Sequence, residues 1–147
     1  MKVLFVCRAN SGRSQMAMEL YNRHYPREAE SAGTKVDEPG QLLAERPTAR
    51  SAIEAMKQIG IDMSANRRRQ LTPGMLDHYD HVVVLAETKS IPAYLNTWPA
   101  AEMWHIEDTR RDGLARAAIV RDYLDQRIVE LAQRLHAPVM DYSQKTP

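Results

Sequence analysis

The sequence predicts an α/β fold, specifically a three-layer doubly wound sandwich with a central four-stranded parallel sheet and helices on both faces. Two observations carry this prediction. Apolar runs of strand length, at residues 3–6 and 81–86, are continuous, which is typical of parallel strands buried on both faces. Segments with helical periodicity separate the strand-like runs, and this alternation favours a parallel sheet covered on both sides.

The first elements are a strand, a polar loop and a helix. The apolar run at residues 3–6 stops at Cys7, and a polar stretch follows as far as Gln15. The next residues on one helical face are Ala17, Leu20, Tyr21 and His24. Pro26 closes this segment, because proline cannot continue the hydrogen-bonding pattern of a helix.

A second strand, a loop and a second helix are expected next. Residues 30–34 form the short strand, and the loop over residues 35–47 lies at the rim of the sheet. We expect Thr48 to cap the following helix and Gly60 to end it. The apolar face of this helix is Ala52, Ile53, Met56 and Ile59.

The second half of the chain supplies the third strand at residues 81–86, a weaker fourth strand at 103–106 and a long amphipathic helix. The apolar face of the helix is Val120, Leu124, Ile128, Leu131 and Leu135. Because 147 residues is a common size for one domain, we interpret residues 1–137 as a single domain. Residues 138–147 are expected to be a C-terminal tail.

Composition restricts the possible functions. Twenty Lys and Arg residues against nineteen Asp and Glu give a net charge of +1, which argues against nucleic-acid or membrane binding by a domain-wide basic field. The run of Arg67, Arg68 and Arg69 is expected to be a solvated face, with steering of anionic substrates as the alternative. The apolar run near the N-terminus is too short for the apolar region of a signal peptide, and no later segment could span a bilayer. A cytoplasmic protein is therefore expected.

The chain has a single cysteine, Cys7. It can form neither an intrachain disulfide nor a cysteine-based zinc site, and a free thiol fits a reducing compartment. The histidines show no spacing typical of metal ligands. We therefore expect no metal and no other cofactor.

The polar loop carries the chemistry. Five residues separate Cys7 from Arg13, enough for the backbone to curl into a nest of inward N–H groups at a helix N-terminus. The residues expected to bind an anionic substrate there are Arg8, Ala9, Asn10, Ser11, Gly12 and Ser14. The helix N-terminus and neighbouring cations favour the nucleophilic thiolate of Cys7. The fork of Arg13 can hold two phosphate oxygens at once.

Two further residues of the loop have expected supporting roles. Ser14 can donate a hydrogen bond to the sulfur and stabilise it as a leaving group. Asn10 tolerates left-handed backbone angles and can brace the loop. The alternative is that Cys7 is only a small core residue at the end of a buried strand. The position of Cys7 and Arg13 between a strand and a helix, with Asn, Ser and Gly in the turn, favours the functional interpretation.

This loop and the motifs that follow it resemble the low-molecular-weight protein tyrosine phosphatase and thioredoxin-coupled arsenate reductase superfamily. The matching segments are residues 2–14, 31–34, 60–64, 69–72 and 80–85. The resemblance implies a general acid at Asp108, on the loop after the fourth strand, where Glu107 and Asp112 are the competing acids. The family usually has proline after this aspartate, and here Thr109 follows.

The resemblance implies a phosphomonoester phosphatase that works through a phosphocysteine without metal, on a phosphorylated protein, phosphotyrosine included, or a small phosphomonoester. The first alternative is an arsenate reductase using the same loop. The thioredoxin-coupled enzymes need further cysteines and this chain has none, so its reductant would be an external thiol. Residues 10–17 look more like the reductase branch and residues 69–72 more like the phosphatase branch. A non-catalytic phosphate-binding module is the third interpretation.

Overall fold

The computed structural model describes residues 1–107 and 113–138. The strands are β1 (Val3–Cys7), β2 (Ala29–Gly33), β3 (His81–Val84) and β4 (Ala101–Met103), and the helices are α1 (Arg13–His24), α2 (Arg50–Lys57), α3 (Ala93–Asn96) and α4 (Gly113–Leu135). Short 3-10 helices occur at Leu43–Glu45, Pro47–Ala49, Pro73–His78 and Thr88–Ser90. All strand pairs are parallel, in the order β2-β1-β3-β4, and the predicted four-stranded doubly wound sheet is confirmed.

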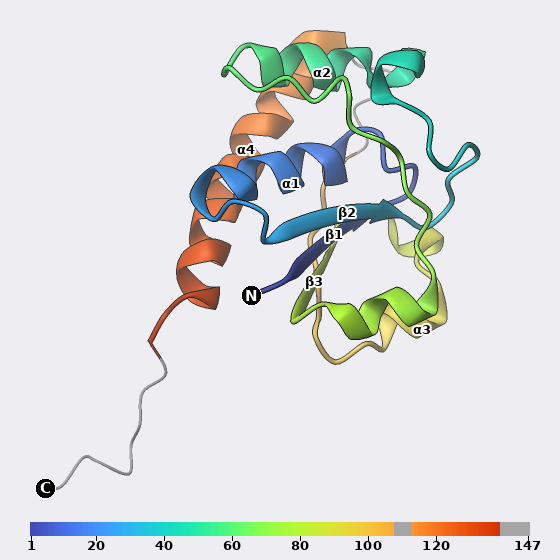
Figure 1. The fold of residues 1–147 in the computed structure, drawn as a ribbon, viewed down its shortest axis with the longest axis vertical. Helices are drawn as coiled ribbons and strands as arrows, with labels where there is room; N and C mark the ends of the chain where they lie inside the picture. Colours follow the sequence, from blue (N-terminus) through green and yellow to red (C-terminus); the bar gives the residue numbers. More distant parts are fainter. Residues whose placement is uncertain (108–112, 139–147) are drawn as a thin grey trace, which may run out of the picture.

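The alternation of side chains along β1 divides the core into two layers. Val3 and Phe5 pack in a cluster with α1, α2 and α4, whereas Leu4 and Val6 belong to a second cluster on the opposite face. Figure 1 shows α1, α2 and α4 on one side of the sheet and α3 on the other. Cys7 shares the face of Val3 and Phe5, so its sulfur lies on the side of the sheet that α1 covers.

Element boundaries differ from the prediction at several places. β2 is residues 29–33 instead of 30–34, and β3 ends at Val84 instead of residue 86. The fourth strand is residues 101–103 instead of 103–106, because its pairing with β3 begins at Ala101 opposite Val82. Thr48 does not cap α2, since the chain enters that helix through a 3-10 turn and no side chain caps its N-terminus. Gly60 does follow α2 in the predicted role, with a φ of +83° that favours glycine.

Glu102 on β4 joins the sheet to α4. Its carboxylate accepts hydrogen bonds from Trp104 Nε1 at 2.9 Å and from Arg134 Nη2 at 2.9 Å, and lies 2.8 Å from His81 Nε2. Burial alone would raise the pKa of Glu102, but these hydrogen bonds outweigh it and hold the pKa at about 2.

Among the described helices, none is both long and apolar enough to cross a membrane.

Replacing Glu102 by Gln tests this junction. Because the folded-state pKa lies below the ordinary value of 4.5, the carboxylate stabilises the fold above that pH and loses its effect as the pH falls toward 2. Glu102→Gln should therefore cost about 1–2 kcal/mol at pH 7, after allowance for solvent screening. Denaturant unfolding from pH 7 to pH 3 should show this difference shrinking. The exposed Glu130 on α4, changed to Gln, is the control and should unfold like the unaltered protein.

Candidate active site

The connection between β1 and α1 turns its carbonyl groups outward. The carbonyl oxygens of Cys7 and Arg8 accept hydrogen bonds from the N–H groups of Thr34 and Lys35, each at 2.8 Å. The peptide bonds are trans, so each N–H lies opposite the carbonyl of its own peptide unit. The N–H groups that follow these carbonyls therefore face the inside of the loop. Within residues 1–107 and 113–138, the N–H groups of residues 8–12 have no acceptor, and such a set of donors suits an anion.

Asn10 holds the loop together from within. It is fully buried and has a φ of +55°, a left-handed conformation that is uncommon outside glycine. Its Oδ1 accepts the N–H of Arg69 at 2.8 Å, which identifies the other amide atom as the donor Nδ2. Nδ2 donates to Ser14 Oγ at 2.8 Å and to Ser31 Oγ at 3.0 Å. The loop is thereby fixed to both α1 and β2.

Ser14 connects this network to the sulfur. Its Oγ lies 3.0 Å from Cys7 Sγ. Because Asn10 Nδ2 already donates to this oxygen, the hydroxyl hydrogen of Ser14 is free to point at the sulfur. Such a hydrogen bond stabilises a negatively charged thiolate more than a neutral thiol. Cys7 is the last residue of β1, where the loop begins, and only 2% of it is exposed.

Arg13, on the first turn of α1, is buried and held at one nitrogen. Nη1 donates to the carbonyl oxygens of Leu85 and Ile106, both at 2.9 Å, and to Glu87 Oε1 at 2.8 Å. These acceptors follow β3 and β4, so the guanidinium is fixed between the ends of two strands. In the described part of the chain, Nε and Nη2 have no acceptor. That edge offers two parallel N–H donors, the geometry that binds two oxygens of one phosphate.

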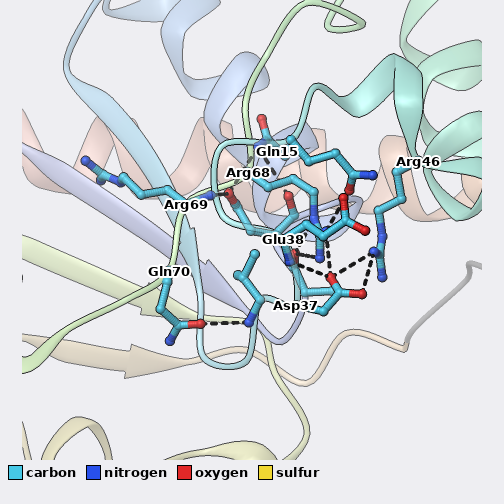
Figure 2. Close-up of polar contacts among 11 residues, drawn as sticks. Gln15, Asp37, Glu38, Arg46, Arg68, Arg69 and Gln70 are labelled. Atoms are coloured by element: carbon cyan, nitrogen blue, oxygen red, sulfur yellow. Dashed lines mark hydrogen bonds and ion pairs between the residues drawn. The ribbon is translucent and has the colours of Figure 1, made fainter.

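A second buried arginine supports the loop from outside. The side chain of Arg68 is 0% exposed and donates from Nε and Nη2 to the carbonyl of Ala9, at 3.1 and 2.9 Å. Its Nη1 contacts Asp37 at 2.7 Å and Gln41 at 2.8 Å, and Asp37 also pairs with Arg46 (Figure 2). The hydrogen bond from Arg68 holds the pKa of Asp37 at about 2. Ala9 thus becomes the third residue whose carbonyl is held outward.

Comparison with known proteins identifies the family. A family model described as low molecular weight phosphotyrosine protein phosphatase matches residues 2–140. The chain belongs to this family of enzymes. Its four-stranded parallel sheet is also found in a solved low molecular weight protein tyrosine phosphatase from T. tengcongensis, with a TM-score of 0.74 and 27% identity over 91% of this chain and 99% of that one.

Curated relatives come from both branches of the phosphatase and reductase superfamily. A probable low molecular weight protein-tyrosine-phosphatase, EpsP of Ralstonia solanacearum, is 35% identical over 94 residues, 62% of this chain and 61% of the relative. The aligned part is thus less than two thirds of that protein. A glutaredoxin arsenate reductase of Synechocystis is 29% identical over 136 residues, 91% of this chain and 98% of the relative.

Most of the site residues predicted from the sequence lie together. The β1–α1 connection brings residues 7–14 into one loop, and the hydrogen bond from Arg13 to Ile106 brings the segment after β4 to its edge. Asp108, together with Thr109 and Asp112, lies outside the described residues. Glu107, one of the competing acids, is exposed and forms an ion pair with Arg116 of α4.

The interpretation of the arginine run as a solvated face is wrong for Arg68, which is buried against the loop. Arg67 is exposed, as expected, and donates to the carbonyl of Gly40. Arg69 is half-buried and pairs with Glu30. A run of three cations contains no signal that singles out its middle member, because burial of Arg68 depends on the distant Asp37. This residue was therefore missed.

Gly33→Ala tests how closely β2 supports the loop. A Cβ at this position would lie 2.6 Å from the carbonyl oxygen of Arg8 and 2.9 Å from the nitrogen of Asn10, both backbone atoms of the loop. The loop must shift, and the affinity for inorganic phosphate, measured by calorimetry, should fall at least about tenfold, or 1.4 kcal/mol. Gly74→Ala is the control, since its Cβ would meet nothing within 4 Å. Equal phosphate affinity in both variants would contradict this view.

Arg68→Met tests the outer support. The change removes both donors from the carbonyl of Ala9 and leaves Arg46 as the remaining described cation paired with Asp37. We therefore expect a loss of about 2 kcal/mol or more in the free energy of unfolding. Phosphate affinity should fall as well. The neighbouring Arg67→Met removes an exposed cation of the same size, and its cost should stay below about 1 kcal/mol. Denaturant unfolding of the two variants decides the matter, and a similar cost for both would refute the role given to Arg68.

Proposed function

We propose that this protein is a phosphomonoester phosphatase that works through a phosphocysteine formed on Cys7. The observation that carries the proposal is the loop itself. A sulfur lies at its base with a hydroxyl at 3.0 Å, amide donors line its interior, and the free edge of Arg13 closes it. We further propose that its substrates are phosphorylated proteins, those bearing phosphotyrosine included, or small phosphomonoesters.

The first step transfers the phosphoryl group to sulfur. The Cys7 thiolate attacks phosphorus, the bond between phosphorus and the ester oxygen breaks, and the three remaining oxygens stay within reach of the loop amides and Arg13. These donors stabilise the charge of the transition state, the main task in phosphoryl transfer. The departing oxygen needs a proton, and we propose Asp108 as its source on the basis of the family resemblance.

The second step returns the enzyme to its starting state. Asp108, now a carboxylate, takes a proton from a water molecule, whose oxygen attacks the phosphorus of the phosphocysteine. The bond between sulfur and phosphorus breaks, inorganic phosphate leaves and the thiolate forms again. The hydroxyl of Ser14 stabilises the sulfur as it departs. Every group in this cycle belongs to the chain or to water, and a single cysteine suffices for it.

Hydrolysis of para-nitrophenyl phosphate tests the proposal. Cys7→Ser should remove activity completely, because the serine hydroxyl stays protonated at neutral pH and is a much weaker nucleophile than a thiolate. Asp108→Asn should lower kcat by about a hundredfold or more, since the leaving group loses its proton donor. Glu107→Gln is the matched comparison, because this neighbouring acid is exposed and paired with Arg116. Turnover that survives in the Cys7→Ser protein would exclude the mechanism, and a larger loss in Glu107→Gln would move the acid to that residue.

Arsenate reduction is the second candidate, favoured by the nearly full-length similarity to the glutaredoxin arsenate reductase of Synechocystis. Arsenate would bind in the same loop and form an adduct with Cys7. An external thiol would then attack the sulfur of Cys7, so that arsenic gains two electrons, arsenite leaves and a mixed disulfide remains. A second external thiol would release Cys7 as the thiolate.

The lone cysteine fits a reducing compartment, and we propose a cytoplasmic location.

Arsenate-dependent oxidation of added glutathione, coupled to a glutaredoxin, separates the two activities. For a phosphatase we expect thiol oxidation at background level and rapid release of para-nitrophenol. The opposite pattern, abolished by Cys7→Ser, would assign the protein to the reductases. Binding of phosphopeptides without turnover in either assay would identify a non-catalytic phosphate-binding module.

A further inference from the structure

A pocket of about 470 Å³ adjoins the loop at Arg8. Arg8 of the loop, Thr34 and Lys35 after β2, and Lys89 and Tyr94 after β3 contribute to its walls. The hydrogen bond from the N–H of Lys35 to the carbonyl of Arg8, at 2.8 Å, keeps two of these residues side by side. Because Arg8 also belongs to the anion loop, the loop and the pocket are adjacent sites.

The charged residues that the structure places in this pocket are positive. They are Arg8, Lys35 and Lys89, and no acid is found among the described lining residues. Within the described part of the chain, none of these three cations has a carboxylate within ion-pair distance. In contrast, Arg13, Arg68 and Arg69 are each paired with an acid. The pocket therefore has a local positive field in a protein whose net charge is only +1.

One of the pocket residues carries a polar atom without a partner among the described residues. The hydroxyl oxygen of Thr34 is buried and makes no hydrogen bond with the described residues. Because less than 1 Å² of this oxygen is exposed, a ligand in the pocket does not contact it directly, and the recognition of a ligand here depends on the three cations instead. Apolar surface from Ile91, Pro92 and Tyr94 completes the lining and suits the uncharged parts of a peptide.

We propose that this pocket is a second anion subsite, which binds a carboxylate or phosphate carried next to the phosphoryl group that Cys7 attacks. The inference rests on the proposed phosphatase function and specifies its substrates. They are phosphopeptides in which an acidic or second phosphorylated residue neighbours the phosphorylated one. Arg8 lies between the two anionic groups, and Lys35 and Lys89 hold the second.

Three phosphotyrosine peptides of otherwise identical sequence test the subsite, with Gln, Glu or phosphoserine beside the phosphotyrosine. We expect kcat/KM to be about three- to tenfold higher for the Glu peptide than for the Gln peptide. A still higher value for the phosphoserine peptide would identify phosphate as the preferred second group, and an equal value would mean that any anion serves. The ratio between peptides is the readout, so a general change in activity cancels.

The variant that tests the subsite combines Lys35→Gln and Lys89→Gln. Its control is Lys57→Gln, which changes another exposed lysine, on α2 and outside this pocket. The double variant should lose the preference for the Glu peptide, and the control should keep it. Equal rates for the Glu and Gln peptides in the unaltered protein would overturn the subsite, as would a preference that survives the double change.

Failure of the phosphatase proposal has a different signature. In that case para-nitrophenyl phosphate, which has no second anion, would not be hydrolysed either. Calorimetric binding of the same peptides to the unaltered protein and to the double variant then tests the subsite without turnover. Equal affinity for the Glu and Gln peptides in that experiment would again overturn it.

Discussion

The site depends on hydrogen bonds that hold three carbonyl groups of the loop pointing away from its interior. The carbonyls of Cys7, Arg8 and Ala9 are held by the N–H groups of Thr34 and Lys35 and by the side chain of Arg68. Because a peptide unit is planar, each bond on the outside orients an N–H on the inside. The inner surface of the loop is therefore determined by residues that an anion in the loop would not touch. This explains why Gly33 of β2 lies so close to the loop backbone and why Arg68 is buried beside the loop.

The central part of this arrangement was predictable from the sequence because its signals are local. A continuous apolar strand, a break at Cys7 and a helical pattern after Gln15 define the β1–loop–α1 unit within about twenty residues. Asn10 takes the left-handed conformation expected of it, since asparagine tolerates positive φ better than most residues. The alternation of strands and helices was enough to predict the parallel sheet. Local sequence could not specify which loop supports which.

What the sequence could not provide depends on contacts between distant segments. Arg68 is buried between the carbonyl of Ala9, far earlier in the chain, and the side chains of Asp37 and Gln41, about thirty residues earlier. The fourth strand begins at Ala101 because that residue pairs with Val82 of β3. The more apolar residues 103–106, which the sequence favours as a strand, lie mostly beyond the end of this pairing. The short helix α3 and the 3-10 turn at Pro73–His78 cover the second face of the sheet without a strong periodic pattern. Each of these features is determined by tertiary packing rather than by local propensity.

The pairing of charges separates the arginines that build the site from the groups that attract an anion. Arg13 is balanced by Glu87 and Arg68 by Asp37, which lowers the cost of burying two cations beside one loop. Because these acids cancel much of the long-range field of the two arginines, the affinity for an anion must come from short-range contacts, namely the loop amides and the free edge of Arg13. Such contacts depend on geometry, and salt screens them less than it screens charges at the surface. The cations of the neighbouring pocket, which have no acidic partner among the described residues, are exposed and act at longer range. The two sets of groups should therefore respond differently to ionic strength.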